Sequence, residues 1–297
     1  MAGVSVRPMT VADVPAVGQI IAEAFNDVWQ RHGFPAPWPR PETAELMTGV
    51  YAGYPEARGF VAECDGTLVG SGFAHIRGDK AGIGPVTVAP EAQSRGVGRA
   101  LMARLLEETG GCSSVRLIQD PFNNASFSLY SKLGFVPRDV VARFVTEDPR
   151  PAQSGNSCAV RAMTADDLES VAALDEQKTG MSRPPDYALL MSLGRQLVCQ
   201  RDGCLTGFLC RVPTDDEVML GPGAAETLDD LQALLCEALR VPGPRRMRLW
   251  LTASQHDLLR CVFDAGFVIS SISTYMVKGA WQPPPGPHFM AMFPEAI

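Results

Sequence analysis

The pattern of apolar and polar residues in the first half of the chain returns in the second half. Residues 6–14 read Val-Arg-Pro-Met-Thr-Val-Ala-Asp-Val, and residues 160–168 read Val-Arg-Ala-Met-Thr-Ala-Asp-Asp-Leu. Each copy is typical of a short strand, a Thr that caps a helix, acidic residues in the first helical turn and then the helix. The sequence therefore predicts that one architecture occurs twice.

Two further segments repeat in the same order. The Asp-Gly pair and following Gly of residues 65–70 return at residues 202–207, and Gly-Phe-Val of residues 134–136 returns at residues 266–268. An Asp-Gly pair between apolar runs is typical of a hairpin turn. Each half thus reads strand-helix-helix, hairpin, strand-helix-strand-helix. This order predicts an α/β fold with a mixed sheet in each half.

The segment from Glu147 to Asn156 is rich in Pro, Ser, Gly and Gln, which is typical of a linker. We therefore expect two domains, at residues 1–146 and 157–297. The length of 297 residues agrees with this division at roughly 150 residues per domain.

A loop in the first half contains the pattern Gln93-x-x-Gly96-x-Gly98, between a strand ending at Val88 and a helix expected over Arg99–Glu108. Glycines let the backbone approach a ligand closely. The start of a helix offers unsatisfied N–H groups and partial positive charge, and Arg95 and Arg99 add full charges. The loop thus predicts an anion site, with a plain strand-to-helix turn as the alternative. Neither a dinucleotide fingerprint nor a Walker loop matches.

The strand before this loop begins with Gly84-Pro85. Because Pro cannot donate to a sheet ladder, we expect an interruption or bulge there, which leaves backbone groups free for an extended ligand. The next strand is expected at Val115–Ile118. The helix after it places Tyr130 one turn from Ser126 and two turns from Asn123, on one face.

The glycine loop and the helix from Asn123 to Phe135 together resemble motifs A and B of the GNAT superfamily of acyl-CoA N-acyltransferases. The resemblance covers residues 4 to about 145 well, and the second half resembles the same fold with degraded motifs, as in tandem GNAT proteins. It implies acetyl-CoA as cosubstrate, without a metal, and transfer of an acetyl group to a primary amine of a small molecule by direct attack. Residues 1–146 would be the acetyl-CoA-binding, catalytic domain, and residues 157–297 a structural or acceptor-binding domain.

The resemblance also implies roles for particular residues. Tyr130 would protonate the leaving thiolate, and a packed core tyrosine is the alternative. Asn123 would contact the pantetheine or position the acyl group. The remaining residues that would contact the cofactor, along the pantetheine arm, at the pyrophosphate or beside them, are Val86, Thr87, Val88, Gln93, Ser94, Arg95, Gly96, Val97, Gly98, Arg99, Ala100 and Ser126.

The sequence does not identify the general base or the acceptor site. His75 and Asp120 are weak candidate bases, because the favoured interpretation is an ordinary polar strand residue for His75 and an ordinary turn residue for Asp120. A water could relay the proton instead. The segment 29–41 contains four prolines and an aromatic set, which either lines the acceptor site or forms a packed surface loop. The set is Trp29, His32, Phe34 and Trp38.

The second half lacks the chemical groups of the first. At the 132-residue spacing of the last repeat, Tyr130 corresponds to Val262 and Asn123 to Gln255. The glycine loop is replaced by an acidic segment in which Thr227-x-x-Asp230 resembles a capping box. Such a box satisfies the helix N-terminus internally, and its carboxylates repel a pyrophosphate. We therefore expect acetyl-CoA in the first half alone.

Composition limits the remaining possibilities. The net charge of −7 makes a nucleic acid an unexpected partner and modestly favours a cationic acceptor. No apolar run reaches the length of a membrane span, and no signal-peptide pattern opens the chain, so we expect a cytoplasmic protein, either monomer or homodimer. The eight Cys form no Cys-x-x-Cys pair, so no metal site is expected. A non-catalytic acyl-CoA-binding or sensing module and a protein-lysine acetyltransferase stay open as alternative functions.

Overall fold

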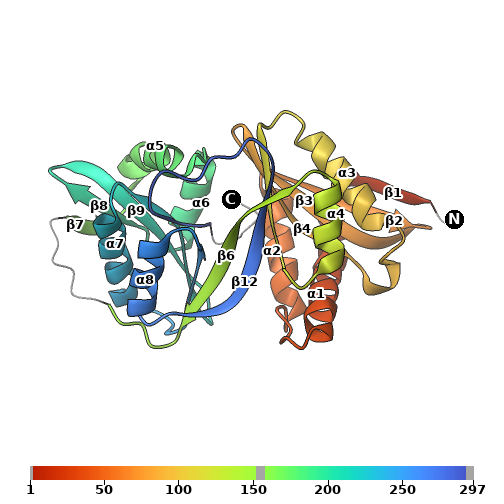
Figure 1. The fold of residues 1–297 in the computed structure, drawn as a ribbon, viewed down its shortest axis with the longest axis horizontal. Coiled ribbons are helices and arrows are strands. Elements are labelled where there is room, and N and C mark those ends of the chain that lie inside the picture. Colours follow the sequence, from red (N-terminus) through yellow and green to blue (C-terminus); the bar gives the residue numbers. More distant parts are fainter. Residues whose placement is uncertain (1–2, 152–157, 292–297) are drawn as a thin grey trace. The chain divides into compact units, whose positions relative to one another are not determined.

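The structure is a computed structural model that describes residues 3–151 and 158–291 (Figure 1). Its contacts divide the described residues into two compact units. The first comprises residues 3–136 and 277–280, and the second comprises residues 137–276 and 281–291 apart from the gap. Each unit combines helices with a mixed sheet, which confirms the predicted α/β class. Part of the expected Glu147–Asn156 linker lies outside the described residues.

In the first unit the strand order is β1-β2-β3-β4-β5, antiparallel except for the parallel pair β4 and β5. The last residues of β12 belong to this unit too, where the Ala280 N–H donates to the Ser113 carbonyl at 2.9 Å. The elements are β1 (Val4–Pro8), α1 (Val14–Arg31), α2 (Pro41–Gly53), β2 (Ala57–Cys64), β3 (Thr67–Arg77), β4 (Lys80–Val88), α3 (Val97–Glu108), β5 (Ser114–Gln119) and α4 (Asn124–Lys132).

In the second unit the strand order is β12-β6-β11-β10-β9-β8-β7, and β13 pairs with β10. The elements are β6 (Val136–Thr146), β7 (Ala159–Ala162), α5 (Leu168–Thr179), α6 (Pro184–Leu193), β8 (Leu197–Arg201), β9 (Cys204–Pro213), β10 (Val218–Ala225), α7 (Leu228–Arg240), β11 (Met247–Thr252), α8 (His256–Asp264), β12 (Val268–Gly279) and β13 (His288–Phe289). Strand β6 precedes the boundary expected at residue 146, yet it pairs with β11 in the second unit.

The two copies of the first repeat fold alike. In each, the capping Thr and the third residue of a short 3-10 helix form a capping box. In each, an Arg of the preceding strand also holds the Asp of that box, through Arg7 and Asp13 at 2.8 Å and Arg161 and Asp167 at 2.7 Å. The same local interactions therefore set the entry to α1 and to α5.

The two faces of the first sheet are covered by different helices (Figure 1). A Cβ atom at Gly72 would lie 2.8 Å from Leu105 of α3, so α3 packs against bare backbone there. The next residue, Phe73, has its ring centroid 5.3 Å from that of Tyr51 on α2. Because successive strand residues point to opposite faces, α3 covers one face and α2 the other.

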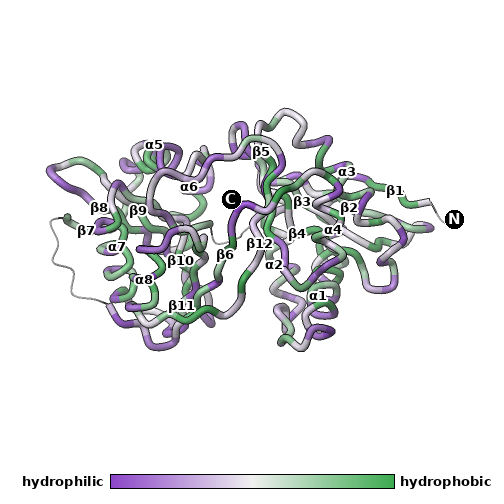
Figure 2. The backbone as a smooth tube through the Cα atoms, in the orientation of Figure 1, coloured by the Kyte–Doolittle hydropathy of each residue, from purple (hydrophilic) through white to green (hydrophobic). Residues whose placement is uncertain are grey.

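Figure 2 shows that the apolar residues concentrate on the central strands, whereas the turns are mainly hydrophilic. In the first unit, buried side chains of β3 and α3 meet at the sheet, among them Phe73, Leu101 and Leu105. None of the helices in the described ranges has both the length and the apolar character needed to span a bilayer.

Candidate active site

Strands β4 and β5 pair for three residues and then diverge. The parallel pairs join Lys80–Gly82 to Ser114–Arg116, and the pairing ends there. On its other edge β4 stays paired with β3 as far as Val88, with an irregular register opposite the segment from Gly72 to Ala74. The bulge expected at Gly84-Pro85 is therefore confirmed. It takes β4 away from β5, so that among residues 3–151 and 158–291 no strand pairs with the second edge of Val86–Val88.

The side chains at this edge mostly support the strand itself. The Thr87 hydroxyl lies 2.9 Å from the Ser71 hydroxyl on β3, and both residues are buried. The Gln93 side chain donates to the Val88 carbonyl at 3.3 Å and so ties the glycine loop to the end of β4. The groups of Val86–Val88 that remain for a ligand are therefore main-chain groups, as the resemblance implies.

The glycine loop connects the end of β4 to the start of α3. The start of α3 therefore lies at the end of the gap that forms where β4 and β5 diverge. Ser94 and Gly96 both have left-handed backbone angles, with φ of 63° and 87°, and Gly96 is the N-cap of α3. The helix begins at Val97, two residues earlier than expected. The Ala100 N–H donates to the Gly96 carbonyl at 3.0 Å, so the N–H groups preceding it are the unsatisfied donors of the helix terminus. Arg95 and Arg99 are exposed beside them.

The predicted residues of the next helix fix α4 to the end of β5. Asn123 is the N-cap of α4, and its side-chain oxygen accepts the Ser126 N–H at 3.1 Å. The Ser126 hydroxyl contacts the Gln119 side chain at 3.1 Å and the Asn123 carbonyl at 3.0 Å. Asn123 therefore has its carboxamide nitrogen to offer a ligand, whereas the Ser126 hydroxyl is engaged within the protein.

Tyr130 lies on α4 and is 9% exposed, with its ring against Phe135. Burial, with a smaller contribution from the charge of Asp120, raises the pKa of Tyr130 to about 12. The phenol therefore keeps its proton throughout the physiological range. That property suits a proton donor and equally suits a core tyrosine.

The two candidate bases have different environments. His75 is buried on β3, where Nε2 lies 3.0 Å from the Gly84 carbonyl and the ring meets Tyr51 edge to face. Burial lowers the pKa of His75 to about 3, so the imidazole is neutral and holds the bulge of β4. Asp120 follows β5, is half-buried and accepts a hydrogen bond from Trp29 Nε1 at 2.7 Å.

The aromatic residues near the end of α1 gather beside Asp120. The Phe34 and Phe122 rings stack at 4.8 Å, and Trp29 packs edge to face against both. His32 contacts Phe122 at 5.0 Å. Phe122 was not predicted as a site residue, although its place shortly after the end of β5 was a usable signal.

Trp38 takes a different part in this segment. Its main chain is held by the Asn26 side chain, which donates to the Trp38 carbonyl at 2.8 Å and accepts the Trp38 N–H at 3.0 Å. Asn26 thus ties the proline-rich loop to α1, and the ring contacts described for the cluster are those of Trp29, His32, Phe34 and Phe122.

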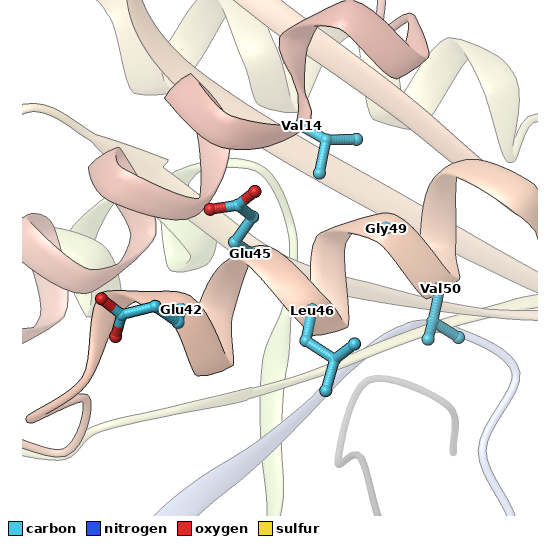
Figure 3. Close-up of a pocket in the computed structure, with 6 residues that line it drawn as sticks. All are labelled: Val14, Glu42, Glu45, Leu46, Gly49 and Val50. Carbon is cyan, nitrogen blue, oxygen red and sulfur yellow. The ribbon is translucent and has the colours of Figure 1, made fainter.

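A shallow surface groove lies on the outer side of α2 (Figure 3). Aliphatic side chains and two carboxylates line it, and Figure 3 shows that they come from α2 and the start of α1. The lining residues are Val14, Glu42, Glu45, Leu46, Gly49 and Val50. None of the predicted site residues belongs to this groove.

Three potential metal ligands meet in the second unit within the described part of the chain. The ligand atoms of Cys158, Cys199 and Asp230 all lie within 4.8 Å of one another. Arg201 already donates to Asp230 at 2.7 Å, and burial raises the pKa of the Cys199 thiol to about 12. The cluster therefore contains an ion pair beside two thiols whose pKa burial raises, and the spacing of these Cys residues along the chain does not indicate it.

We expect the buried neutral imidazole of His75 to make stability depend on pH. Below pH 6.5 the unfolded chain binds a proton at His75 that the folded chain does not bind until about pH 3. The free energy of unfolding should therefore fall with decreasing pH in this window, by up to about 1.4 kcal/mol per pH unit from this group. Urea denaturation between pH 4 and 7.5 measures the free energy of unfolding. We expect this free energy to fall less steeply with decreasing pH in His75→Gln than in the unmodified chain, whereas the exposed control His32→Gln should keep the slope of the unmodified chain. Equal slopes for both variants would contradict the assignment.

Residues 20–135 match the sequence model of the acetyltransferase (GNAT) family. No match was found among curated proteins. A protein from Pyrococcus horikoshii, provisionally named an acetyltransferase, has a similar structure at 19% identity, with a TM-score of 0.75 over 98% of this chain and 96% of its own. A GCN5-related N-acetyltransferase from Sphaerobacter thermophilus is similar at 16% identity, with a TM-score of 0.67 over 97% and 98% of the two chains.

A tandem GNAT protein of the clavulanic acid biosynthesis pathway is similar at 15% identity, with a TM-score of 0.63 over 94% of this chain and 100% of its own. At these identities the structural matches establish the fold, while the sequence match covers the glycine loop, the diverging strands and α4. Residues 20–135 thus match the acetyltransferase (GNAT) family, and the whole chain has a fold similar to that of a tandem GNAT protein.

Proposed function

We propose that the first unit binds acetyl-CoA and transfers its acetyl group to a primary amine of a small molecule. The observation that carries this proposal is the divergence of β4 from β5, with the start of α3 at the open end. An acyl-pantetheine arm can pair with the main chain of Val86–Val88 as an added strand. The pyrophosphate then meets the N–H groups of the loop from Gln93 to Ala100 and the charges of Arg95 and Arg99.

The proposed reaction is direct attack of the neutral amine on the thioester carbonyl. A C–N bond forms, the C–S bond breaks, and the nitrogen loses a proton while the sulfur gains one. Tyr130 is the proposed donor to the departing thiolate, because its hydroxyl is protonated and lies on the α4 face that also carries Asn123. Asn123 contributes the donor of its carboxamide to the cofactor.

We propose that the amine binds beside Asp120. The carboxylate can hold an ammonium group and receive its proton, and the faces of the neighbouring aromatic rings, those of Trp29, Phe34 and Phe122, can attract a cation. Of the two candidate bases, Asp120 is favoured because His75 is buried and already engaged with Gly84. The overall negative charge supports the same class of acceptor.

Substitution of Gly96 should separate charge from backbone strain in cofactor binding. Asn and Asp tolerate the left-handed angle of this residue similarly, and no atom lies within 4 Å of a Cβ placed there. We expect Gly96→Asp to weaken CoA binding by roughly 10- to 100-fold relative to Gly96→Asn, because the carboxylate faces the phosphate site. Calorimetric titration of the full chains with CoA measures the two affinities. Equal affinities for the two variants would show that the loop is not part of the cofactor site.

Replacement of Tyr130 by Phe should lower kcat by about 10²- to 10⁴-fold and leave CoA affinity nearly unchanged, since the hydroxyl acts only as the thiolate leaves. Tyr54→Phe, in the same unit, is the control. Because the pKa of Tyr130 is about 12, activity should rise with pH as the amine loses its proton and show no fall from Tyr130 below about pH 10. Unchanged turnover of Tyr130→Phe, with chemistry rate-limiting, would assign Tyr130 to the core.

Asp120→Asn keeps an acceptor for Trp29 and removes the charge. We expect kcat/KM for the amine to fall by roughly 10²-fold or more, as for loss of a general base, while the affinity for CoA changes little. The matched control is Asp79→Asn, which changes an exposed carboxylate directly before β4. Thiol release with a panel of small amines is the assay. A selective loss of acetyl-CoA affinity in Asp120→Asn would place the residue on the cofactor side.

A further inference from the structure

The second unit repeats the strand divergence of the first. Strands β10 and β11 pair in parallel from Val218 with Met247 to Leu220 with Leu249, and the pairing then ends. On its other edge β10 stays paired with β9 as far as Ala225, with an irregular register after Leu220. The counterpart of the proposed cofactor gap therefore exists in the second unit.

A segment near the end of the described chain occupies this counterpart. Gly223 pairs with Phe289 and Ala224 with His288 in antiparallel register. The Ala225 N–H donates to the Pro287 carbonyl at 3.2 Å. On the opposite side, the Met290 N–H donates to the carbonyl of Trp250 on β11 at 3.1 Å. The segment Pro287–Ala291 is thus hydrogen-bonded to both diverging strands.

The residues that hold this segment are the counterparts of the proposed cofactor contacts. Gly221-Pro222 corresponds to Gly84-Pro85, so Gly223–Ala225 correspond to Val86–Val88. Gln255 is the N-cap of α8, as Asn123 is of α4.

The Gln255 side chain forms hydrogen bonds with both main-chain polar groups of His288 in this segment. Its side-chain oxygen accepts the His288 N–H at 2.9 Å, and its nitrogen donates to the His288 carbonyl at 3.0 Å. The carboxamide makes no side-chain bond to its own helix terminus. A side chain at the capping position therefore serves an extended ligand instead of the helix.

The segment is packed as an interior element. Phe289 is fully buried, and His288, Met290 and Ala291 are also buried. A Cβ atom at Gly221 would lie 2.1 Å from the Met290 carbonyl oxygen, so the backbones approach as closely as a glycine permits. Such burial leaves no room for a second extended chain between β10 and β11.

The phosphate end of this groove is closed as well. Thr227 caps α7 by accepting the Asp230 N–H at 3.2 Å, and the first turn carries Asp229 and Asp230, of which Asp230 is paired with Arg201. A ligand of this groove is therefore an uncharged extended chain with amide groups, which describes a peptide segment and excludes a pyrophosphate.

We propose that Pro287–Ala291 is a resident intramolecular ligand of the second unit, held by β10, β11 and Gln255 in the place that an acyl-pantetheine arm takes in the first unit. The segment thereby excludes acyl-CoA from the second unit and supplies the missing strand partner of β10. The comparison with acyl-CoA rests on the proposed function, whereas the binding of the segment does not.

Hydrogen exchange of the full chain tests the segment directly. We expect Gln255→Ala to speed amide exchange at His288 and Met290 by roughly 10- to 100-fold, because a buried N–H and a buried carbonyl lose their partner. Gln255→Glu keeps the acceptor for the His288 N–H and removes the donor, so its effect should be intermediate. Arg260→Gln, exposed on the same helix, is the control and should leave exchange unchanged. Unmodified exchange rates in Gln255→Ala would overturn the proposal.

Titration of the same chain with CoA tests the exclusion. We expect saturation at about one CoA per chain, slower exchange at residues 86–88 and no change at residues 287–290. Binding of two equivalents of CoA, or faster exchange at residues 287–290 on adding CoA, would show that the segment can be displaced. Either result would contradict the proposal that the segment excludes acyl-CoA from the second unit. If no CoA binds at all, the proposed function fails, while the Gln255 variants still decide whether the segment is held as described.

Discussion

The hydrogen-bonding demand of a parallel strand pair that comes apart governs both units of this protein. Buried backbone N–H and carbonyl groups need partners, so a strand that leaves its neighbour must find another. In the second unit the chain supplies that partner itself, as Pro287–Ala291 bonds to β10 and to β11. In the first unit no strand of the described part of the chain pairs with the same edge of Val86–Val88. Several features support this divergence of the parallel strands. They are the bulges, the buried His75 at the Gly84 carbonyl, and the capping residues of α4 and α8.

The helix that follows the bulged strand decides which ligand the geometry accepts. Helices α3 and α7 each follow the bulged strand of their unit, so each presents the backbone donors and the dipole of a helix N-terminus. Gly96 caps α3 with no side-chain bond and has two exposed arginines beside it, whereas Thr227 caps α7 with its hydroxyl and is followed by two aspartates. The second unit therefore has a closed helix terminus, reached by a shorter connection from the strand, where we propose an anion site in the first unit.

The sequence predicted what short-range chemistry determines. The Asp-Gly turns at residues 65–66 and 202–203 have left-handed angles at both positions, as the hairpin requires, and α4 and α8 keep the 132-residue spacing. The start of α3 was placed too late because Gly98 is a poor helix former in isolation, although tertiary packing accepts it. Long-range partners could not be predicted: β6 packs with the second unit, Phe122 stacks on Phe34, and residues 288–289 pair with β10.

Burial also limits where charge can reside during the proposed reaction. His75 is neutral because burial lowers its pKa to about 3, and Tyr130 is neutral because burial raises its pKa to about 12. When the bound amine is neutral, nitrogen loses one proton and sulfur gains one. The transfer releases no net proton, so it needs no charged base. A charged group is needed earlier, when an ammonium ion from solution gives up its proton. Asp120 is half-buried beside the aromatic cluster, which places a carboxylate where that earlier step would occur and keeps it outside the neutral interior.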